Sequence, residues 1–218
     1  MTLRGEIEGV LTPGMVLPEA LGVLLDWIET NGLVLARRGK TVGTLYPVDA
    51  INAGWTDSER PGGTYVEFYA EGNEHLHHWF GHENPSVLGR LCVIGRAGAD
   101  GSMLALWLDP EDQTRIVHIG SGSGSSMVSL LGATAVDFLR LLAIGYDEIC
   151  WGCEVFDKTS EEAFAEAGLV VHPNHAFREW VCERFDVTIP ARGIEVVPHP
   201  GDMNAKTSSD PFCCWIRG

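Results

Sequence analysis

The sequence predicts an α+β fold in which a mixed, largely antiparallel sheet is flanked by helices within a single domain. The main sign is the segment 91–149, where three apolar stretches separated by tight turns precede a helical pattern. Asp-Gly within the turn 99–102 tolerates the positive φ angle that a tight hairpin needs. A length of 218 residues also suffices to bury a sizeable core.

The N-terminal third predicts one helix and several short strands. Residues 18–31 carry leucine and isoleucine at helical spacing, and Asn31-Gly32 at their end is a typical helix stop. The elements that follow are short strands and a loop, and after them a histidine-rich helix. They are strands at 33–36 and 41–46 around a basic turn at 37–40, a loop at 52–63, a half-exposed strand at 64–70 and a histidine-rich helix at 73–83.

The central segment predicts strands at 91–94, 103–108 and 115–119. The nearly unbroken apolar run 103–108 is typical of a strand that is buried on both faces. In the helix that follows, Val136, Leu139 and Leu142 recur at helical spacing, so this helix is expected to close one face of the sheet.

The C-terminal part, 151–218, is interpreted as an elaboration on a core at about 18–150. Residues 146–168 hold seven acidic residues and one lysine. Within this run Thr159 or Ser160 is expected to cap a short helix that ends at Gly168. The expected elements beyond it are a helix at 173–185, a short strand at 194–197 and an apolar end at 212–216.

The charge limits the classes of partner. With 15 basic and 30 acidic residues, the chain has a net charge of −15. That balance argues against binding nucleic acid, whose affinity depends on Lys and Arg neutralising phosphates, and it favours a cationic protein partner or simply solubility. The start of the chain lacks the apolar region of a signal peptide, and no apolar segment reaches the roughly 20 residues of a membrane span. We therefore expect a cytoplasmic protein with reduced thiols and no membrane contact.

One stretch suggests a metal site. On a helix, Glu74, His78 and His82 would lie one turn apart on one face, as three metal ligands could. The segment lacks the His-Glu-x-x-His order of zinc hydrolases, and Gly81 weakens a helix where the third ligand is needed. A histidine-rich helix without metal is the preferred interpretation, and a small metal-dependent hydrolase remains the alternative.

Two further motifs receive structural interpretations. Cys150 and Cys153 have a C-x-x-C spacing, but no second suitable pair follows, and the acidic run after them would raise a thiol pKa. Buried structural cysteines are therefore expected. The Gly-Ser loop 120–126 lies where a phosphate loop would, but it lacks the Gly-Lys-Ser/Thr that would follow, so a flexible loop is expected.

The order of elements resembles the SMI1/KNR4 (SUKH) superfamily over residues 18–143. The resemblance is carried by a proline-led helix before a strand at 17–33, a glycine-bearing turn into the apolar strand at 98–109, a strand ending near His118, a loop, and the helix 135–143. It implies an α+β fold without catalysis. Bacterial members of the superfamily are often immunity proteins that bind and block a toxin, frequently a nuclease, whereas fungal members are scaffolds. The superfamily gives no catalytic residues to carry over, and the C-terminal part and the histidine cluster depart from its pattern.

We therefore expect a non-catalytic binding protein without a cofactor, an immunity protein against a cationic, nuclease-type toxin, in an oligomeric state left open. An intracellular regulatory scaffold is the further alternative beside the metal-dependent hydrolase. The expected contact surface is acidic. It comprises Asp147, Glu148, Glu154, Asp157, Glu161 and Glu162.

Overall fold

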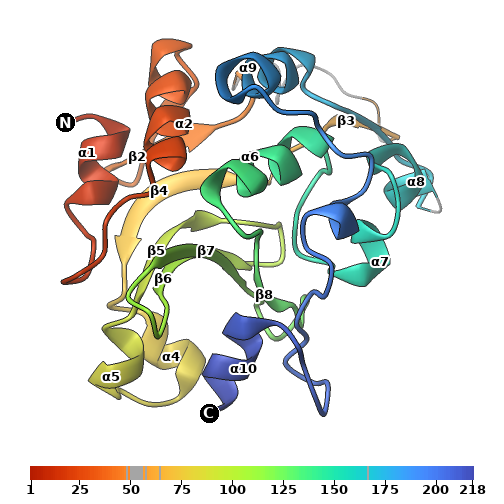
Figure 1. Cartoon of the computed structure of the whole chain (residues 1–218). Coiled ribbons are helices and arrows are strands. Elements are labelled where there is room, and N and C mark those ends of the chain that lie inside the picture. Colours follow the sequence, from red (N-terminus) through yellow and green to blue (C-terminus); the bar gives the residue numbers. More distant parts are fainter. Residues whose placement is uncertain (48, 50–55, 57, 64, 166) are drawn as a thin grey trace.

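A seven-stranded antiparallel sheet organises the chain, with strand order β1-β2-β4-β5-β6-β7-β8 (Figure 1). The structure is a computed structural model that describes residues 1–47, 49, 56, 58–63, 65–165 and 167–218. The predicted α+β class, with a largely antiparallel sheet and flanking helices, is confirmed. The strands of the sheet are β1 (Val34–Arg37), β2 (Lys40–Thr44), β4 (Glu67–Gly72), β5 (Leu91–Arg96), β6 (Met103–Leu108), β7 (Thr114–Ile119) and β8 (Val128–Leu130).

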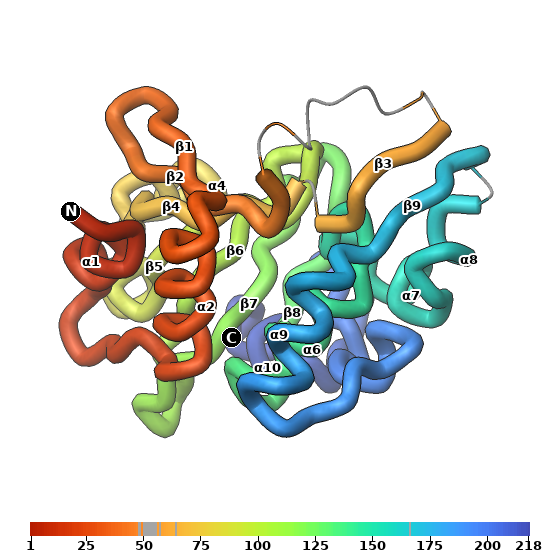
Figure 2. The backbone as a smooth tube through the Cα atoms, turned by 90° about the horizontal axis from the view of Figure 1, so that it is seen from above, coloured from red at the N-terminus to blue at the C-terminus, as the bar shows by residue number. Residues whose placement is uncertain are grey.

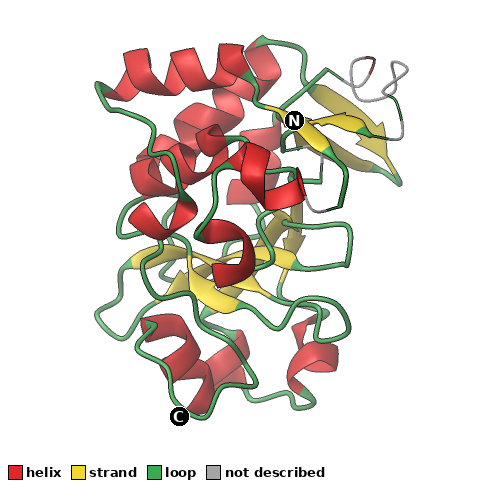
Figure 3. Cartoon of the chain, turned by 90° about the vertical axis from the view of Figure 1, so that its right-hand side faces the viewer, coloured by secondary structure: helices red, strands yellow, loops and turns green. Residues whose placement is uncertain are grey.

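Helices cover both faces of this sheet (Figures 1 and 3). One face carries α1 (Leu3–Glu8), α2 (Glu19–Thr30) and α6 (Ala135–Ile144), and α9 (His175–Phe185) packs on α6. The other face carries the short helices α4 (Leu76–Phe80), α5 (Pro85–Leu88) and α10 (Pro211–Arg217). Beside the main sheet, β3 (Glu59–Pro61) pairs in parallel with β9 (Val170–His172), next to α7 (Cys153–Phe156) and α8 (Ser160–Ala165) (Figure 2).

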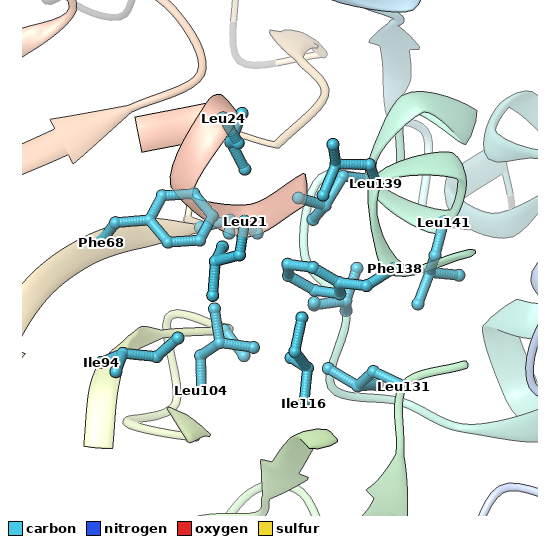
Figure 4. Packing of buried hydrophobic residues seen from close by; sticks show 14 of the residues in the cluster. Leu21, Leu24, Phe68, Ile94, Leu104, Ile116, Leu131, Phe138, Leu139 and Leu141 are labelled. Carbon is cyan, nitrogen blue, oxygen red and sulfur yellow. The ribbon is translucent and has the colours of Figure 1, made fainter. Parts of the chain in front are cut away.

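The core lies between the sheet and the helices α2 and α6 (Figure 4). Each of these helices has an apolar stripe at a spacing of three or four residues, which turns leucines and Phe138 toward the strands. Thr134 and Asp137 form a capping box that fixes where α6 begins. The residues that meet in the centre include Leu21, Leu24, Phe68, Ile94, Leu104, Ile116, Phe138 and Leu139.

A second apolar cluster fills the opposite face of the sheet. Trp107 of β6 is 5.2 Å from the ring of Phe212 and 5.3 Å from the ring of Trp215, both on α10. Strand β6 is therefore buried on both faces, as its unbroken apolar run predicts.

The described helices include none that could cross a lipid bilayer, because none combines the necessary length with sufficient hydropathy.

Some elements differ from the sequence prediction. The strand predicted at 194–197 is wrong, since a 3-10 helix, η1 (Gly193–Glu195), lies there. The loop predicted at 52–63 contains β3, whose partner β9 lies more than 100 residues further along the chain; residues 52–55 and 57 lie outside the described residues. Helix α4 is shorter than the predicted 73–83, because Gly81 adopts a φ angle of 69° and ends it.

Asp210 closes the outer edge of the sheet at β8. This buried carboxylate accepts hydrogen bonds from the Ser129 hydroxyl at 2.8 Å and from the Leu130 amide at 2.9 Å. It also caps α10 by accepting from the Cys213 amide at 2.8 Å. The edge strand is thus paired with a side chain instead of being left open to another chain.

We expect Asp210→Ala to lower the free energy of unfolding by about 2 to 4 kcal/mol, because it removes a helix cap and leaves buried donors without an acceptor. Urea denaturation measures the loss. Asp26→Ala is the control, since Asp26 is exposed and paired with Arg4, and its loss should cost less than about 1 kcal/mol. Equal effects of the two substitutions would contradict this role of Asp210.

Candidate partner-binding surface

Four of the predicted contact residues form an exposed acidic group on α7 and α8. These are Glu154, Asp157, Glu161 and Glu162, and they are called the acidic face below. The Thr159 hydroxyl accepts from the Glu162 amide, and the Glu162 carboxylate accepts from the Thr159 amide, so a capping box starts α8 as predicted. This hydrogen bond from the Thr159 amide lowers the pKa of Glu162 and keeps it charged.

Two of the predicted contact residues are buried and cannot belong to an accessible surface. Asp147 is only 2% exposed, and its Oδ2 lies 3.0 Å from a guanidinium nitrogen of Arg60 on β3. Glu148 accepts from the Ala99 amide at 2.8 Å and from the Trp151 indole at 2.5 Å. Both carboxylates follow α6 and turn inward to bind neighbouring segments, so the expected surface of six residues is corrected to four.

Two basic side chains, Arg192 and Lys158, lie near enough to Glu162 for their charges to lower its pKa. Arg192 approaches Glu162 at 3.9 Å, and both side chains are more than half exposed. An exposed pair at that distance contributes little because water and salt screen it. The four exposed carboxylates outnumber these two cations, so the acidic face keeps an excess of negative charge.

The Gly-Ser loop is ordered around the carboxylate of Asp100. Asp100 accepts from the Ser121 hydroxyl at 2.7 Å, from the Ser125 amide at 2.8 Å, and from both the amide and the hydroxyl of Ser102. Burial alone would raise the pKa of Asp100, but these hydrogen bonds outweigh it and lower the pKa to about 2. A flexible loop is expected from the sequence, but in the structure these hydrogen bonds hold the loop in a closed turn.

Glycine is required where this loop passes closest to Asp100. A Cβ atom on Gly124 would lie 2.7 Å from the Cβ of Asp100, and Gly122 has a φ angle of 75°. The Gly-Ser loop therefore has a structural role, which is to enclose the Asp100 carboxylate and donate hydrogen bonds to it. An Asp-Gly turn followed by a serine-rich loop was the signal in the sequence that could have indicated it.

His118 lies in β7 behind this loop and is fully buried. Its Nδ1 is 2.9 Å from the Met127 carbonyl oxygen, so Nδ1 carries the proton and donates it. Burial lowers the pKa of His118 to about 4, although the Met127 carbonyl and Asp100 act in the opposite direction. His118 is therefore neutral at pH 7, and its Nε2 has no partner among the residues that the structure describes.

The two cysteines of the C-x-x-C motif lie in different environments. Cys150 is buried as predicted, whereas Cys153 is exposed at the start of α7, so that prediction is wrong for Cys153. Burial raises the pKa of Cys150, with a further rise from Glu148, and burial and Asp157 raise the pKa of Cys153. Both thiols are therefore protonated at pH 7 and are poor nucleophiles.

The histidine cluster does not assemble the suggested trio of ligands. Glu74 precedes α4, His78 lies within it, and His82 follows the left-handed Gly81. The rings of His77 and His78 lie against each other at an interplanar angle of 43°, with centroids 3.8 Å apart. Among the described residues, no group of three His, Cys, Asp or Glu side chains is placed to hold a metal ion.

Comparisons with known proteins add no relative. No protein-family model matches the chain, and neither a search of curated proteins nor one of solved structures returned a match. The resemblance to the SMI1/KNR4 superfamily therefore rests on the order of elements in the sequence alone.

We expect Asp100→Asn to cost about 1 to 2 kcal/mol of stability at pH 7, because the amide nitrogen of Asn cannot accept from the surrounding donors. The folded pKa of about 2 is below the ordinary 3.8, so the stabilisation by Asp100 is complete above about pH 4 and is lost toward pH 2. Urea denaturation of both proteins over this range should show the difference closing.

Asp112→Asn is the matched control for this experiment. Asp112 also lies in a tight turn, and its side chain is 77% exposed beside Arg90, so its loss should cost less than about 1 kcal/mol. A stability difference for Asp100→Asn that stays constant down to about pH 2 would contradict the role assigned to the charge.

We expect the contribution of Asp147 to stability to depend on pH in the opposite direction. Burial raises its pKa to about 6 despite the partner Arg60, so the folded protein takes up this proton before the unfolded chain does. The wild type should therefore gain about 1 to 3 kcal/mol relative to Asp147→Asn as the pH falls from about 7 to 4. Taking the difference between two proteins removes the contribution of His118, which both retain. A constant difference would contradict the prediction, and the exposed Glu161→Gln variant should follow the wild type.

Proposed function

We propose that this protein is a non-catalytic binding protein, an immunity protein that neutralises a cationic, nuclease-type toxin in the cytoplasm. The observation that carries the proposal is the acidic face on α7 and α8, where four exposed carboxylates gather on a chain of net charge −15. The order of elements that resembles the SMI1/KNR4 superfamily supports the same class of function.

Electrostatics would determine how such a complex forms. A nuclease presents Lys and Arg where it contacts phosphates, and the acidic face offers carboxylates to the same groups. Complementary charge would speed association and orient the two proteins. Once bound, the immunity protein would block the nucleic-acid substrate from the toxin sterically. Association should therefore slow at high ionic strength.

Most residues of the acidic face are available to a partner, whereas Glu162 is engaged in capping α8. Three of them, Glu154, Asp157 and Glu161, make no ion pair with any residue that the structure describes. Removing or reversing their charges should leave the fold intact, because surface changes away from caps and cores alter stability little.

No specific observation among the described residues favours either alternative, the metal-dependent hydrolase or the regulatory scaffold. A metal-dependent hydrolase would need Glu74, His78 and His82 on one helical face, and Gly81 ends α4 before His82. A regulatory scaffold shares the binding surface with the preferred proposal and differs from it only in the identity of the partner.

The proposal is tested with the product of the adjacent gene as the partner. Reversing three charges with Glu154→Lys, Asp157→Lys and Glu161→Lys should weaken binding about 100-fold or more, because like charges would then face each other. Glu162 is left unchanged because its carboxylate caps α8. Surface plasmon resonance at two salt concentrations gives the association rate and the affinity.

A matched control reverses three exposed glutamates elsewhere, Glu74, Glu111 and Glu183. Both variants change the net charge equally, so only a site-specific effect separates them. Equal weakening would attribute binding to net charge alone, and unchanged binding of the first variant would remove the acidic face from the interface. Absence of any binding by the wild type would contradict the proposed partner.

A further inference from the structure

Four of the 15 basic residues of this acidic chain line one cavity at the end of the sheet. An open cavity of about 440 Å³ lies across β1, β2, β4 and the end of β5. Its walls are formed by Arg37, Arg38, Lys40, Val42, Glu67, Tyr69, Glu71 and Arg96. Phe68 points from β4 into the core on the side of α2, so its neighbours Glu67 and Tyr69 face the opposite side, where the cavity opens (Figure 4).

The cavity has an excess of positive charge. Four cations face two carboxylates, which leaves two positive charges in a chain whose total is −15. The sequence shows only the basic turn at 37–40, and the fold adds Arg96 by pairing its backbone position with Glu67 across β4 and β5. Clustering like charges costs energy unless a ligand or a fixed counter-charge offsets it.

Glu67 holds two guanidinium groups next to each other. Its side chain is only 6% exposed, and it accepts from Arg37 at 2.8 and 2.9 Å and pairs with Arg96 at 3.1 Å. One carboxylate shared by two guanidinium groups leaves one positive charge in excess. A buried carboxylate at this position fixes the two groups before any ligand arrives, which lowers the cost of ordering them.

One buried nitrogen and one exposed guanidinium group at the cavity have no partner among the described residues. The Nε of Arg96 is buried and has no partner among the described residues. Arg38 lies at the exposed hairpin turn with a φ angle of 51° and forms no ion pair within the part of the chain that is described. Lys40 pairs with Glu71 and lies 5.7 Å from the ring centroid of Tyr69.

We propose that this cavity binds a small ligand that carries a doubly charged phosphate group of the monoester class. A phosphate monoester bears nearly two negative charges at pH 7, which balances the excess of the cavity, and its oxygens accept from several donors at once. Val42 and the ring of Tyr69 provide an apolar wall for the organic part of the ligand. The volume falls in the range of small-molecule sites.

A polymeric anion does not fit this site. A nucleic acid would bring many phosphates near a chain of net charge −15, and only the local excess of two charges would attract it. A small ligand avoids this repulsion because it contacts the cavity alone. The inference concerns a surface separate from the acidic face, and it holds whether or not the proposed toxin is the partner.

The experiment titrates phenyl phosphate, inorganic phosphate, succinate and acetate into the ¹⁵N-labelled full chain, with amide shifts as the readout. Phenyl phosphate should shift the amides of residues 37–42, 67–71 and 96. Inorganic phosphate should bind more weakly at the same place because it lacks the apolar group. No shift up to about 10 mM phenyl phosphate, or equal binding of succinate, would overturn the assignment.

Variants locate the site. Arg38→Asn with Lys40→Gln should weaken phenyl phosphate binding about tenfold or more, because it removes two charged donors. Arg38→Asn alone repeats the test at an exposed turn position where Asn tolerates the positive φ angle, so a folded protein is retained. Lys206→Gln, which removes an exposed charge in the segment before α10, is the control and should bind as the wild type does. Equal affinity of Arg38→Asn and the control would contradict the site.

Discussion

The central strands of the sheet are apolar on both faces, and this constraint accounts for most of the architecture. On β6, Leu104 and Leu106 face α2 and α6, whereas Ala105 and Trp107 face the other side. An antiparallel sheet can leave one face in water, but this one cannot, because each face of β6 would expose large apolar side chains. Residues beyond the predicted core must therefore return to the sheet, and α10 does so by placing Phe212 and Trp215 against Trp107.

Local signals predicted the elements whose stability is local. The helix α6 has its apolar stripe, its Thr134 cap and Gly145 at its end within a dozen residues, so its bounds can be read from the sequence. The strands β3 and β9 are three residues each and depend on each other across more than 100 positions, so no local pattern marks them. Likewise, the apolar end of the chain is visible in the sequence, but the helix it forms depends on the buried cap Asp210 and on Trp107 beneath it.

The same reasoning explains why only part of the acidic surface could be predicted. The sequence shows only how many charges lie close together along the chain. By that measure, Asp147 and Glu148 belong to the same acidic run as Glu154 and Asp157. Burial separates them, because the first two follow α6 into the protein, where Arg60 and the Ala99 amide pair with them. Arg60 belongs to β3, an element that the sequence did not indicate, and so the partner that keeps Asp147 inside was hidden as well.

The net charge of −15 does not show that a group of carboxylates and a group of cations lie in different parts of the molecule. The acidic face lies on α7 and α8, and the cationic cavity lies at β1 and β2, at opposite ends of the molecule (Figure 2). Local groups of opposite charge at the two ends would orient a charged molecule as it approaches, before contact is made. Because Glu67 is buried and pairs with both Arg37 and Arg96, the fold holds these two guanidinium groups of the cavity next to each other. Screening by salt would weaken the orientation of a distant partner much more than it would weaken the Glu67 cluster.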